Sequence, residues 1–311
     1  MPSPSTGGRS VKRKSRSPSK RRPPGRSPKV SPTRIAASRS LSSQPAAGGG
    51  PTGGGKLWFY GRHAVEAALK NPRRTCHQLL ATDEALERLA SDAQNRAPDI
   101  RRVDRADLDA KLGEHVVHQG LALAVAPLPS LSLERACGTA GAPASVELPS
   151  AADADTNPSQ GRTATVLVLD RINDPHNLGA ILRSAVAFGA RAVIVPHRQS
   201  AELGGATAKA ASGALDMIPI VEVTNLARTL DALKEMGYWR AGLDGRAPQT
   251  LDEAPTFEKL ALVLGAEGTG IRRLVAEHCD LTVRLPIREE MESLNVSVAC
   301  GIALYALARK G

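Results

Sequence analysis

The feature that most constrains this 311-residue chain is a regular alternation of short apolar runs and helical patterns that begins near Thr165. Strands are predicted at 166–169, 192–195, 217–223, 239–243, 260–264 and 281–285, with helices at about 178–188, 225–236, 270–278 and 293–309. Continuously apolar strands that alternate with helices are typical of a mostly parallel sheet covered on both faces. We therefore predict an α/β domain over 164–311, with any ligand beyond the carboxyl ends of its strands.

A second, smaller α/β region precedes this domain. The apolar and aromatic run 57–60 is followed by a helical pattern that stops just before Pro72. Further elements are expected at 79–81 (strand), 83–95 (helix) and 121–126 (strand). The sequence thus predicts a small α/β domain over 56–127.

Two stretches lack the apolar residues that a packed core requires. Residues 1–55 hold 12 of the 41 Lys and Arg and none of the 31 Asp and Glu, so the rest of the chain has a net charge of −2. We expect 1–55 to be a disordered basic tail, which is either a nucleic-acid-binding arm or a solvated extension. Residues 128–163 are rich in Ala, Ser, Pro, Gly and Thr and are expected to form a flexible linker.

Several classes of protein are disfavoured by composition. The chain has no run of 18 apolar residues that could span a membrane, and its basic N-terminus lacks the apolar core of a secretory signal. Its four cysteines contain no CxxC pair, which argues against a structural zinc site or a disulfide framework. We therefore expect a cytoplasmic protein without a membrane partner or a bound metal.

The first two of three polar segments follow predicted strands. Segment 170–179 opens a helix, where Asn177 is expected as the N-terminal cap and Arg183 projects from the second turn. The alternative is a capped turn with a surface arginine. Segment 264–270 has three glycines that permit positive φ and close approach of a ligand, and Glu267 can accept a hydrogen bond or act as a base. Its GxxGxG spacing differs from the GxGxxG dinucleotide fingerprint.

The third polar segment, 285–297, leads from a predicted strand into the last helix. Ser293 is a reasonable cap for that helix. Capping by Ser293 does not explain Asn295, because asparagine is unfavourable inside an otherwise apolar helix.

Together the three segments resemble, in order and spacing, the three motifs of the SpoU (TrmH-type) 2′-O-ribose methyltransferases in the knotted SPOUT superfamily. The match covers essentially all of 166–309, and the stretches Tyr60–Glu66 and Val117–Leu121 resemble the family's ribosomal-protein-like substrate-binding domain. The resemblance implies a trefoil knot in the C-terminal domain and S-adenosylmethionine as cofactor. It also implies that the substrate is RNA, most closely a guanosine in the P loop of 23S rRNA. A homodimer is implied as well.

Residue roles follow from the motif match alone. Catalytic roles are implied for Arg183, Asn177, Glu267, Ser293 and Asn295, and cofactor binding for Gly265, Leu285 and Leu294. Because a guanidinium stays protonated in proteins, we expect Arg183 to bind the adjacent phosphate and stabilise the developing alkoxide rather than act as a base. The two leucines could equally pack in the core, and the apolar last helix could serve a core or a subunit interface.

Three alternatives remain open at this point. The substrate could be a tRNA ribose, the chain could bind RNA without catalysis, or it could be a nucleotide-binding oxidoreductase, which the missing GxGxxG disfavours. The loop 288–292 also carries three glutamates where close relatives usually have small or uncharged residues in its first part. Carboxylates there would repel RNA phosphates unless they point outward, which leaves the RNA target open.

Overall fold

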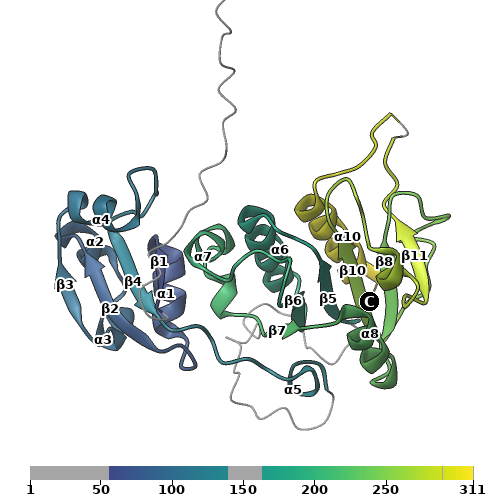
Figure 1. Ribbon diagram of the computed structural model, residues 1–311, viewed down its shortest axis with the longest axis horizontal. Coiled ribbons are helices and arrows are strands. Elements are labelled where there is room, and N and C mark those ends of the chain that lie inside the picture. The colour runs from purple at the N-terminus through teal and green to yellow at the C-terminus, as the bar shows by residue number, and fades with distance from the viewer. Residues whose placement is uncertain (1–55, 139–162, 289, 311) are drawn as a thin grey trace, which may run out of the picture. The chain divides into compact units, whose positions relative to one another are not determined.

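The structure, a computed structural model, describes residues 56–138, 163–288 and 290–310 (Figure 1). The expectation for the basic tail 1–55 lies outside these residues. The described chain forms two sheets, one of four strands and one of seven. Among the described residues, no helix has the length and apolar character needed to cross a membrane.

The smaller sheet has the strand order β1-β4-β2-β3. Its elements are β1 (Leu57–Tyr60), α1 (Arg62–Lys70), β2 (Cys76–Ala81), α2 (Asp83–Arg88), α3 (Ser91–Arg96), β3 (Ile100–Arg102), α4 (Arg105–Leu112) and β4 (Leu121–Val125). The prediction of one helix over 83–95 is wrong, because Leu89 leaves the helical conformation at ψ 133°. The Gln94 side chain then donates to the carbonyls of Leu86 and Leu89, which adds hydrogen bonds to carbonyl oxygens at the end of α2.

The larger sheet has the order β7-β6-β5-β10-β8-β11-β9, and all of its described strand pairs are parallel. Its strands are β5 (Ala164–Asp170), β6 (Ala192–Pro196), β7 (Ile220–Val223), β8 (Trp239–Leu243), β9 (Gln249–Thr250), β10 (Lys259–Gly265) and β11 (Leu281–Arg284). The predicted parallel sheet is thus confirmed, and β5 and β10 lie next to each other at its centre.

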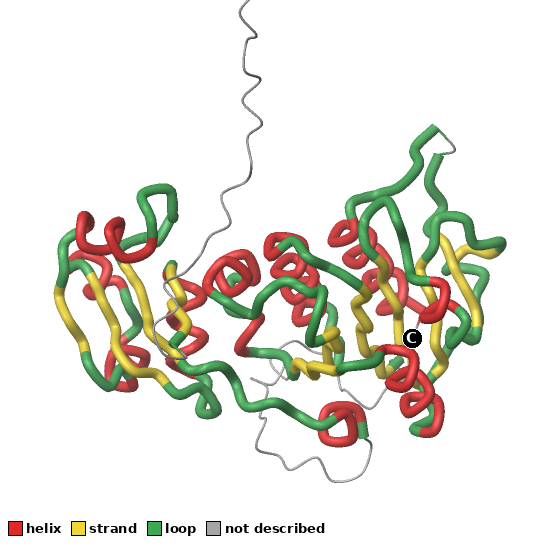
Figure 2. The backbone as a smooth tube through the Cα atoms, in the orientation of Figure 1, coloured by secondary structure: helices red, strands yellow, loops and turns green. Residues whose placement is uncertain are grey.

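Helices cover both faces of this sheet (Figure 2). One set comprises α6 (Pro175–Ala187), α7 (Gly205–Ala211) and α10 (Val296–Lys310), with a 3-10 turn at Ala214–Asp216; the other comprises α5 (Leu133–Cys137), α8 (Leu226–Glu235) and α9 (Arg273–Ala276). Alternate residues of β5 contribute to the two cores, with Leu167 and Leu169 on the α6 side and Val166 and Val168 on the α8 side. This alternation explains why the strand reads as a continuous apolar run.

Helix α5 falls inside the stretch predicted to be a flexible linker. Ser132 caps the helix, and Ala136 and Cys137 are buried. The Tyr238 hydroxyl donates to the Cys137 carbonyl at 2.9 Å, and burial raises the pKa of Tyr238 to about 12. The linker prediction therefore does not hold for 133–137, while 139–162 lie outside the described residues.

The four cysteines are free thiols. Burial raises the pKa of Cys300 to about 12 and those of Cys137 and Cys279 to about 11. In the described part of the chain, no group of three or more His, Cys, Asp or Glu side chains could hold a metal ion. Buried protonated thiols of this kind behave as small apolar side chains.

The end of β10 makes an unusually close backbone contact. After Gly265 the chain turns back on itself, so that Ala266 bridges Gly270. A Cβ atom added at Gly265 would overlap the carbonyl carbon of Gly270 and the amide nitrogen of Ile271. A glycine is therefore required for the loop 266–271 to pack directly on the strand end.

Replacing this glycine tests the contact. We expect Gly265→Ala to lower the free energy of unfolding by about 1–3 kcal/mol, because backbone atoms must move to admit the methyl group. The matched control is Gly301→Ala on α10, where the new Cβ would lie 3.5 Å from the Ser184 hydroxyl. That change should be neutral or stabilise by up to about 1 kcal/mol. Urea denaturation measures both, and equal effects of the two substitutions would contradict the close contact.

Candidate functional site

The polar segments that follow β5 and β10 meet at one edge of the larger sheet. Strands β5 and β10 pair in parallel, with Asp170 opposite Gly265, so the segments that continue from them leave the sheet side by side. This register confirms that the first two predicted segments lie together at the carboxyl edge. The third segment approaches the same place, because Asn295 contacts residues of both.

An ion pair on a buried carboxylate ties the first segment to the residues that follow the second. The Asp170 carboxylate is fully buried, and it accepts hydrogen bonds from the backbone N–H of Arg272 at 2.9 Å and from its Nε at 2.8 Å. Next to it, Arg171 takes a left-handed φ of 61° and its Nη2 donates to the Thr269 hydroxyl at 3.2 Å. The sequence analysis predicted neither pair. The one indication in the sequence was Asp170, a charged residue at the end of an apolar strand.

The start of α6 differs from the prediction for Asn177. The N-cap is Asp174, whose side chain accepts from the His176 N–H at 2.9 Å, and Pro175 occupies the first turn, where its missing N–H is tolerated. Asn177 lies within that first turn and does not cap the helix, so the predicted capping role is wrong. Its side chain is left to make tertiary contacts instead.

Asn295 joins the three segments through its side-chain amide. Its Nδ2 donates to Asn177 Oδ1 at 2.9 Å and lies 3.4 Å from Glu267 Oε2. Its Oδ1 accepts from the backbone N–H groups of Ser297 at 2.9 Å and Val298 at 3.4 Å. Asn295, rather than Ser293, therefore caps α10, which explains an asparagine at this position.

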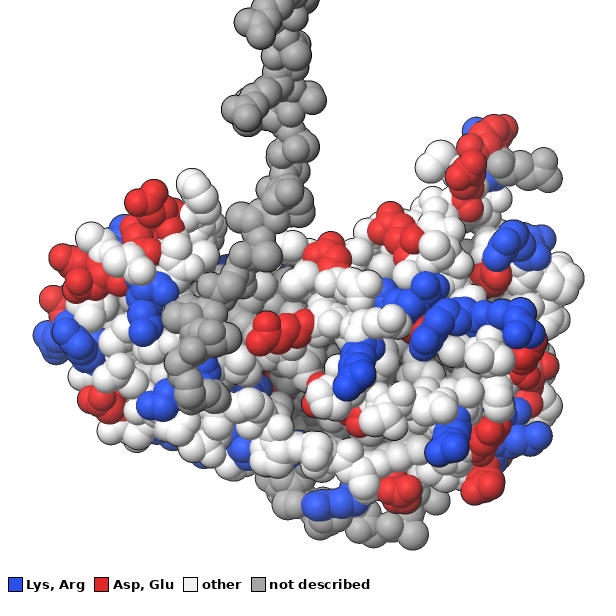
Figure 3. Space-filling view, in the orientation of Figure 1, with Lys and Arg blue, Asp and Glu red and all other residues white. Residues whose placement is uncertain are grey.

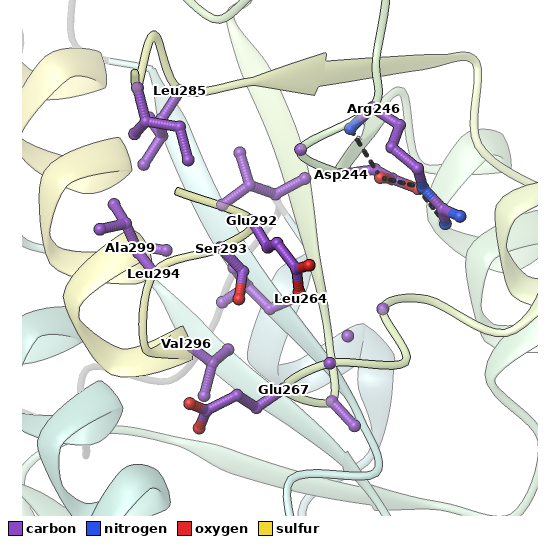
Figure 4. A pocket seen from close by; sticks show the side chains of 17 residues that line it. Asp244, Arg246, Leu264, Glu267, Leu285, Glu292, Ser293, Leu294, Val296 and Ala299 are labelled. Atoms are coloured by element: carbon purple, nitrogen blue, oxygen red, sulfur yellow. Dashed lines mark hydrogen bonds and ion pairs between the residues drawn. The ribbon is translucent and has the colours of Figure 1, made fainter. Parts of the chain in front are cut away.

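A pocket of about 280 Å³ opens beside this network (Figure 4). Its lining includes five of the residues singled out in the sequence: Gly265, Glu267, Leu285, Ser293 and Leu294. Leu264, Val296 and Ala299 add apolar surface to it. The structure thus brings together at one pocket residues that the sequence had divided among cofactor binding and catalysis.

Two charged residues of the pocket were missed by sequence reasoning, namely Asp244 and Arg246 in the turn that follows β8. Glu292 also lines the pocket, although the sequence analysis considered the glutamates of its loop only with respect to RNA. Burial opposes ionisation of Asp244, but hydrogen bonds from the backbone N–H and guanidinium of Arg246 outweigh it, so the pKa of Asp244 lies below its usual value. No motif marked this turn, because the residues that follow β8 have no counterpart among the three polar segments.

Arg183 lies on α6 with its side chain exposed and does not line the pocket. Among the described residues it forms no ion pair, so its guanidinium is available to an anion from outside the chain. Figure 3 shows basic side chains gathered over the C-terminal part of the visible face, with acidic groups between them.

Comparison with known proteins gives two family matches. Residues 164–305 match the SpoU rRNA Methylase family, and residues 58–131 match the RNA 2′-O ribose methyltransferase substrate binding family. These ranges correspond to the larger and the smaller sheet.

Individual proteins match over most of the chain. The 23S rRNA (guanosine-2′-O-)-methyltransferase RlmB of Xanthomonas campestris is 39% identical, over 81% of this chain and 96% of the relative. RlmB of Pseudomonas putida is 40% identical, with the same shares covered. Among solved structures, a putative RNA methyltransferase of the TrmH family from Porphyromonas gingivalis matches with a TM-score of 0.61 and 25% identity, over 83% of this chain and 91% of that one. The SpoU methyltransferase AviRb from Streptomyces viridochromogenes in complex with AdoMet shares the fold, with a TM-score of 0.63, 23% identity and 82% and 90% coverage.

The capping role of Asn295 can be tested by two substitutions. We expect Asn295→Ala to lower the free energy of unfolding by about 1 kcal/mol, because α10 loses its cap, whereas Asn295→Ser should retain most of the stability, since serine caps equally well. Asn225→Ala, which removes the cap of α8 away from the pocket, should cost a similar amount. Denaturant unfolding compares the three variants, and equal losses in Asn295→Ser and Asn295→Ala would rule out the capping role.

Proposed function

The chain belongs to the SpoU family of RNA 2′-O-ribose methyltransferases, and we propose that it methylates the 2′-hydroxyl of a guanosine in the P loop of 23S rRNA. Its larger domain has the family's knotted α/β fold, and its smaller domain is the substrate-binding domain. The observation that carries the proposal is the meeting of all three motif segments through Asn295, Asn177 and Glu267, beside a pocket that residues of the second and third segments line.

The pocket suits S-adenosylmethionine. Leu264, Leu285 and Leu294 give it apolar walls for an adenine ring, and the backbone at Gly265 can be approached closely because it bears no side chain. Three carboxylates against one guanidinium give the lining a formal charge of −2, which favours a cation. When bound, the cofactor supplies an electrophilic methyl group on a positively charged sulfur. We therefore assign its binding to Gly265, Leu285 and Leu294.

Arg183 is proposed as the residue that activates the ribose. Its exposed, unpaired guanidinium can bind the phosphate next to the target nucleotide and stabilise negative charge as the 2′-oxygen loses its proton. Asn177, Glu267 and Asn295 are already connected by hydrogen bonds, so they present a fixed polar edge to the ribose. Ser293, in the pocket lining, completes this edge. Orientation of the ribose and the cofactor supplies much of the rate acceleration, because the carbon–sulfur bond needs no further activation.

The choice of rRNA rests on the relatives. Both RlmB proteins named above act on a guanosine of 23S rRNA, and each matches over 81% of this chain. The smaller domain corresponds to a substrate-binding family specific to RNA ribose methyltransferases. We place the reaction in the cytoplasm, where ribosomal RNA is modified in bacteria.

We also propose that α10 forms a subunit interface in a homodimer. Val298, Ile302 and Tyr305 lie at helical spacing on one face of α10 and are 50%, 44% and 52% exposed. Phe188 packs edge-on against Tyr305, with ring centroids 6.1 Å apart, which widens this apolar surface. Contiguous apolar surface of this kind favours association, and a second copy can present the same face in return.

The role of Arg183 is tested by substitution. We expect Arg183→Ala to lower kcat for methylation of 23S rRNA by about 10²–10³-fold, as for the loss of one donor that stabilises developing negative charge. Arg228→Ala, an exposed arginine of α8 on the other face of the sheet, should leave the rate unchanged. The readout is incorporation of radiolabelled methyl groups, followed by mapping of 2′-O-methyl sites in cells with and without the gene. Methylation of a tRNA ribose instead would overturn the substrate, and near-normal rates in Arg183→Ala would overturn the mechanism.

The interface is tested by placing a charge in it. Ile302→Glu should raise the dimer dissociation constant on the order of 30-fold, because a carboxylate would be desolvated on association. The control is Leu274→Glu on α9, where the side chain is 60% exposed on the other face of the sheet. Analytical ultracentrifugation measures both, and an unchanged dimer in Ile302→Glu would exclude α10 as the interface.

A further inference from the structure

Glu292 places a carboxylate at the proposed cofactor pocket. Glu292 lines the pocket, and in Figure 4 its side chain projects from the segment before α10 into the space that the drawn residues enclose. Glu292 lies near the turn after β8, since a Cβ atom added at Gly245 would be 3.8 Å from the Glu292 carbonyl oxygen. Glu292 and Glu290 are both exposed, but only Glu292 lines the pocket.

The other charges of the pocket are already engaged. Asp244 and Arg246 form an ion pair at 3.3 Å, and hydrogen bonds between them keep the pKa of Asp244 low and that of Arg246 high. Glu267 lies 3.4 Å from the amide nitrogen of Asn295. Within the described residues, the Glu292 carboxylate has no hydrogen-bond or ion-pair partner. Its negative charge is therefore directed at whatever occupies the pocket.

Methyl transfer changes the charge of the pocket's occupant. S-adenosylmethionine carries a sulfonium cation. When its methyl group bonds to the ribose 2′-oxygen, the carbon–sulfur bond breaks, and the sulfur keeps that electron pair and becomes a neutral thioether. The proton lost by the 2′-hydroxyl goes to solvent. A carboxylate in the pocket therefore attracts the substrate form of the cofactor more strongly than the product form, S-adenosylhomocysteine.

We propose that Glu292 is a specificity-determining residue that makes the pocket favour the charged methyl donor over the neutral product. The proposal rests on the proposed function, since it requires this pocket to bind S-adenosylmethionine. Discrimination by charge lowers product inhibition, because binding energy that depends on the sulfonium disappears when the methyl group is transferred. The last carboxylate of the loop 288–292 thus acts on the cofactor.

The test is the ratio of two dissociation constants. Isothermal titration calorimetry gives the affinities of the full-length protein for S-adenosylmethionine, S-adenosylhomocysteine and sinefungin, which carries an amine in place of the sulfonium. Glu292→Gln keeps the shape of the side chain and removes its charge. We expect it to weaken binding of both cations about three- to tenfold and to leave the affinity for S-adenosylhomocysteine unchanged within about twofold. Glu290→Gln is the matched control and should leave every affinity unchanged.

The possible outcomes separate the inference from the function beneath it. If wild-type protein binds both cofactor forms and Glu292→Gln leaves their ratio unchanged, the inference is wrong. Equal weakening of all three ligands would also overturn it, because that result indicates a role in the shape of the pocket. If the wild-type protein binds none of them, the proposed cofactor assignment fails instead. Raising the salt concentration should reduce the wild-type preference toward that of Glu292→Gln.

Discussion

A buried carboxylate at the end of β5 sets the geometry on which the functional edge of the larger sheet depends. Asp170 has no exposed surface, and its two oxygens are satisfied by one residue, Arg272, through both backbone and side chain. An unpaired charge at this depth would cost several kcal/mol, so the segment that carries Arg272 has to return to the strand end. That return path is open only because β10 ends in Gly265, over which the loop 266–271 lies without a side chain between them.

This arrangement places the functional groups on rigid supports. Glu267 is carried by the loop held at both ends by Gly265 and Arg272. Asn177 stands in the first turn of α6, and Asn295 is fixed by the N–H groups of α10. Groups anchored in this way need little reorganisation when a substrate arrives, which is the requirement for catalysis by orientation and by fixed charge.

The sequence predicted the parallel sheet well, because its strands are buried on both faces and read as unbroken apolar runs. Helix starts were harder to place. Asp174 and Asn177 are both good caps three residues apart, and the deciding signal was Pro175, which prefers the first turn. Helix α5 was missed because five residues are too few for a periodic pattern to emerge from a composition typical of linkers.

The candidate site was predictable only in part, for a physical reason. Residues of the three motif segments could be recognised by pattern, whereas Asp244 and Arg246 follow β8 and reach the pocket only because β8 is the neighbour of β10 in the sheet. Strand order is a tertiary property that local sequence does not encode. The knot likewise came from family resemblance, since threaded chains are exceptions to the general rules of chain topology.

The capping contact of Asn295 has a consequence for anyone who redesigns this protein. One amide group supplies an acceptor to the start of α10 and a donor to the functional edge. Serine, threonine and aspartate can replace the acceptor, but their side chains cannot at the same time offer an N–H to Asn177. A library selected for stability alone would therefore accept several residues at position 295, whereas one selected for function should return asparagine. The difference between the two libraries would reveal the role of the donated hydrogen bond without a structure of a bound ligand.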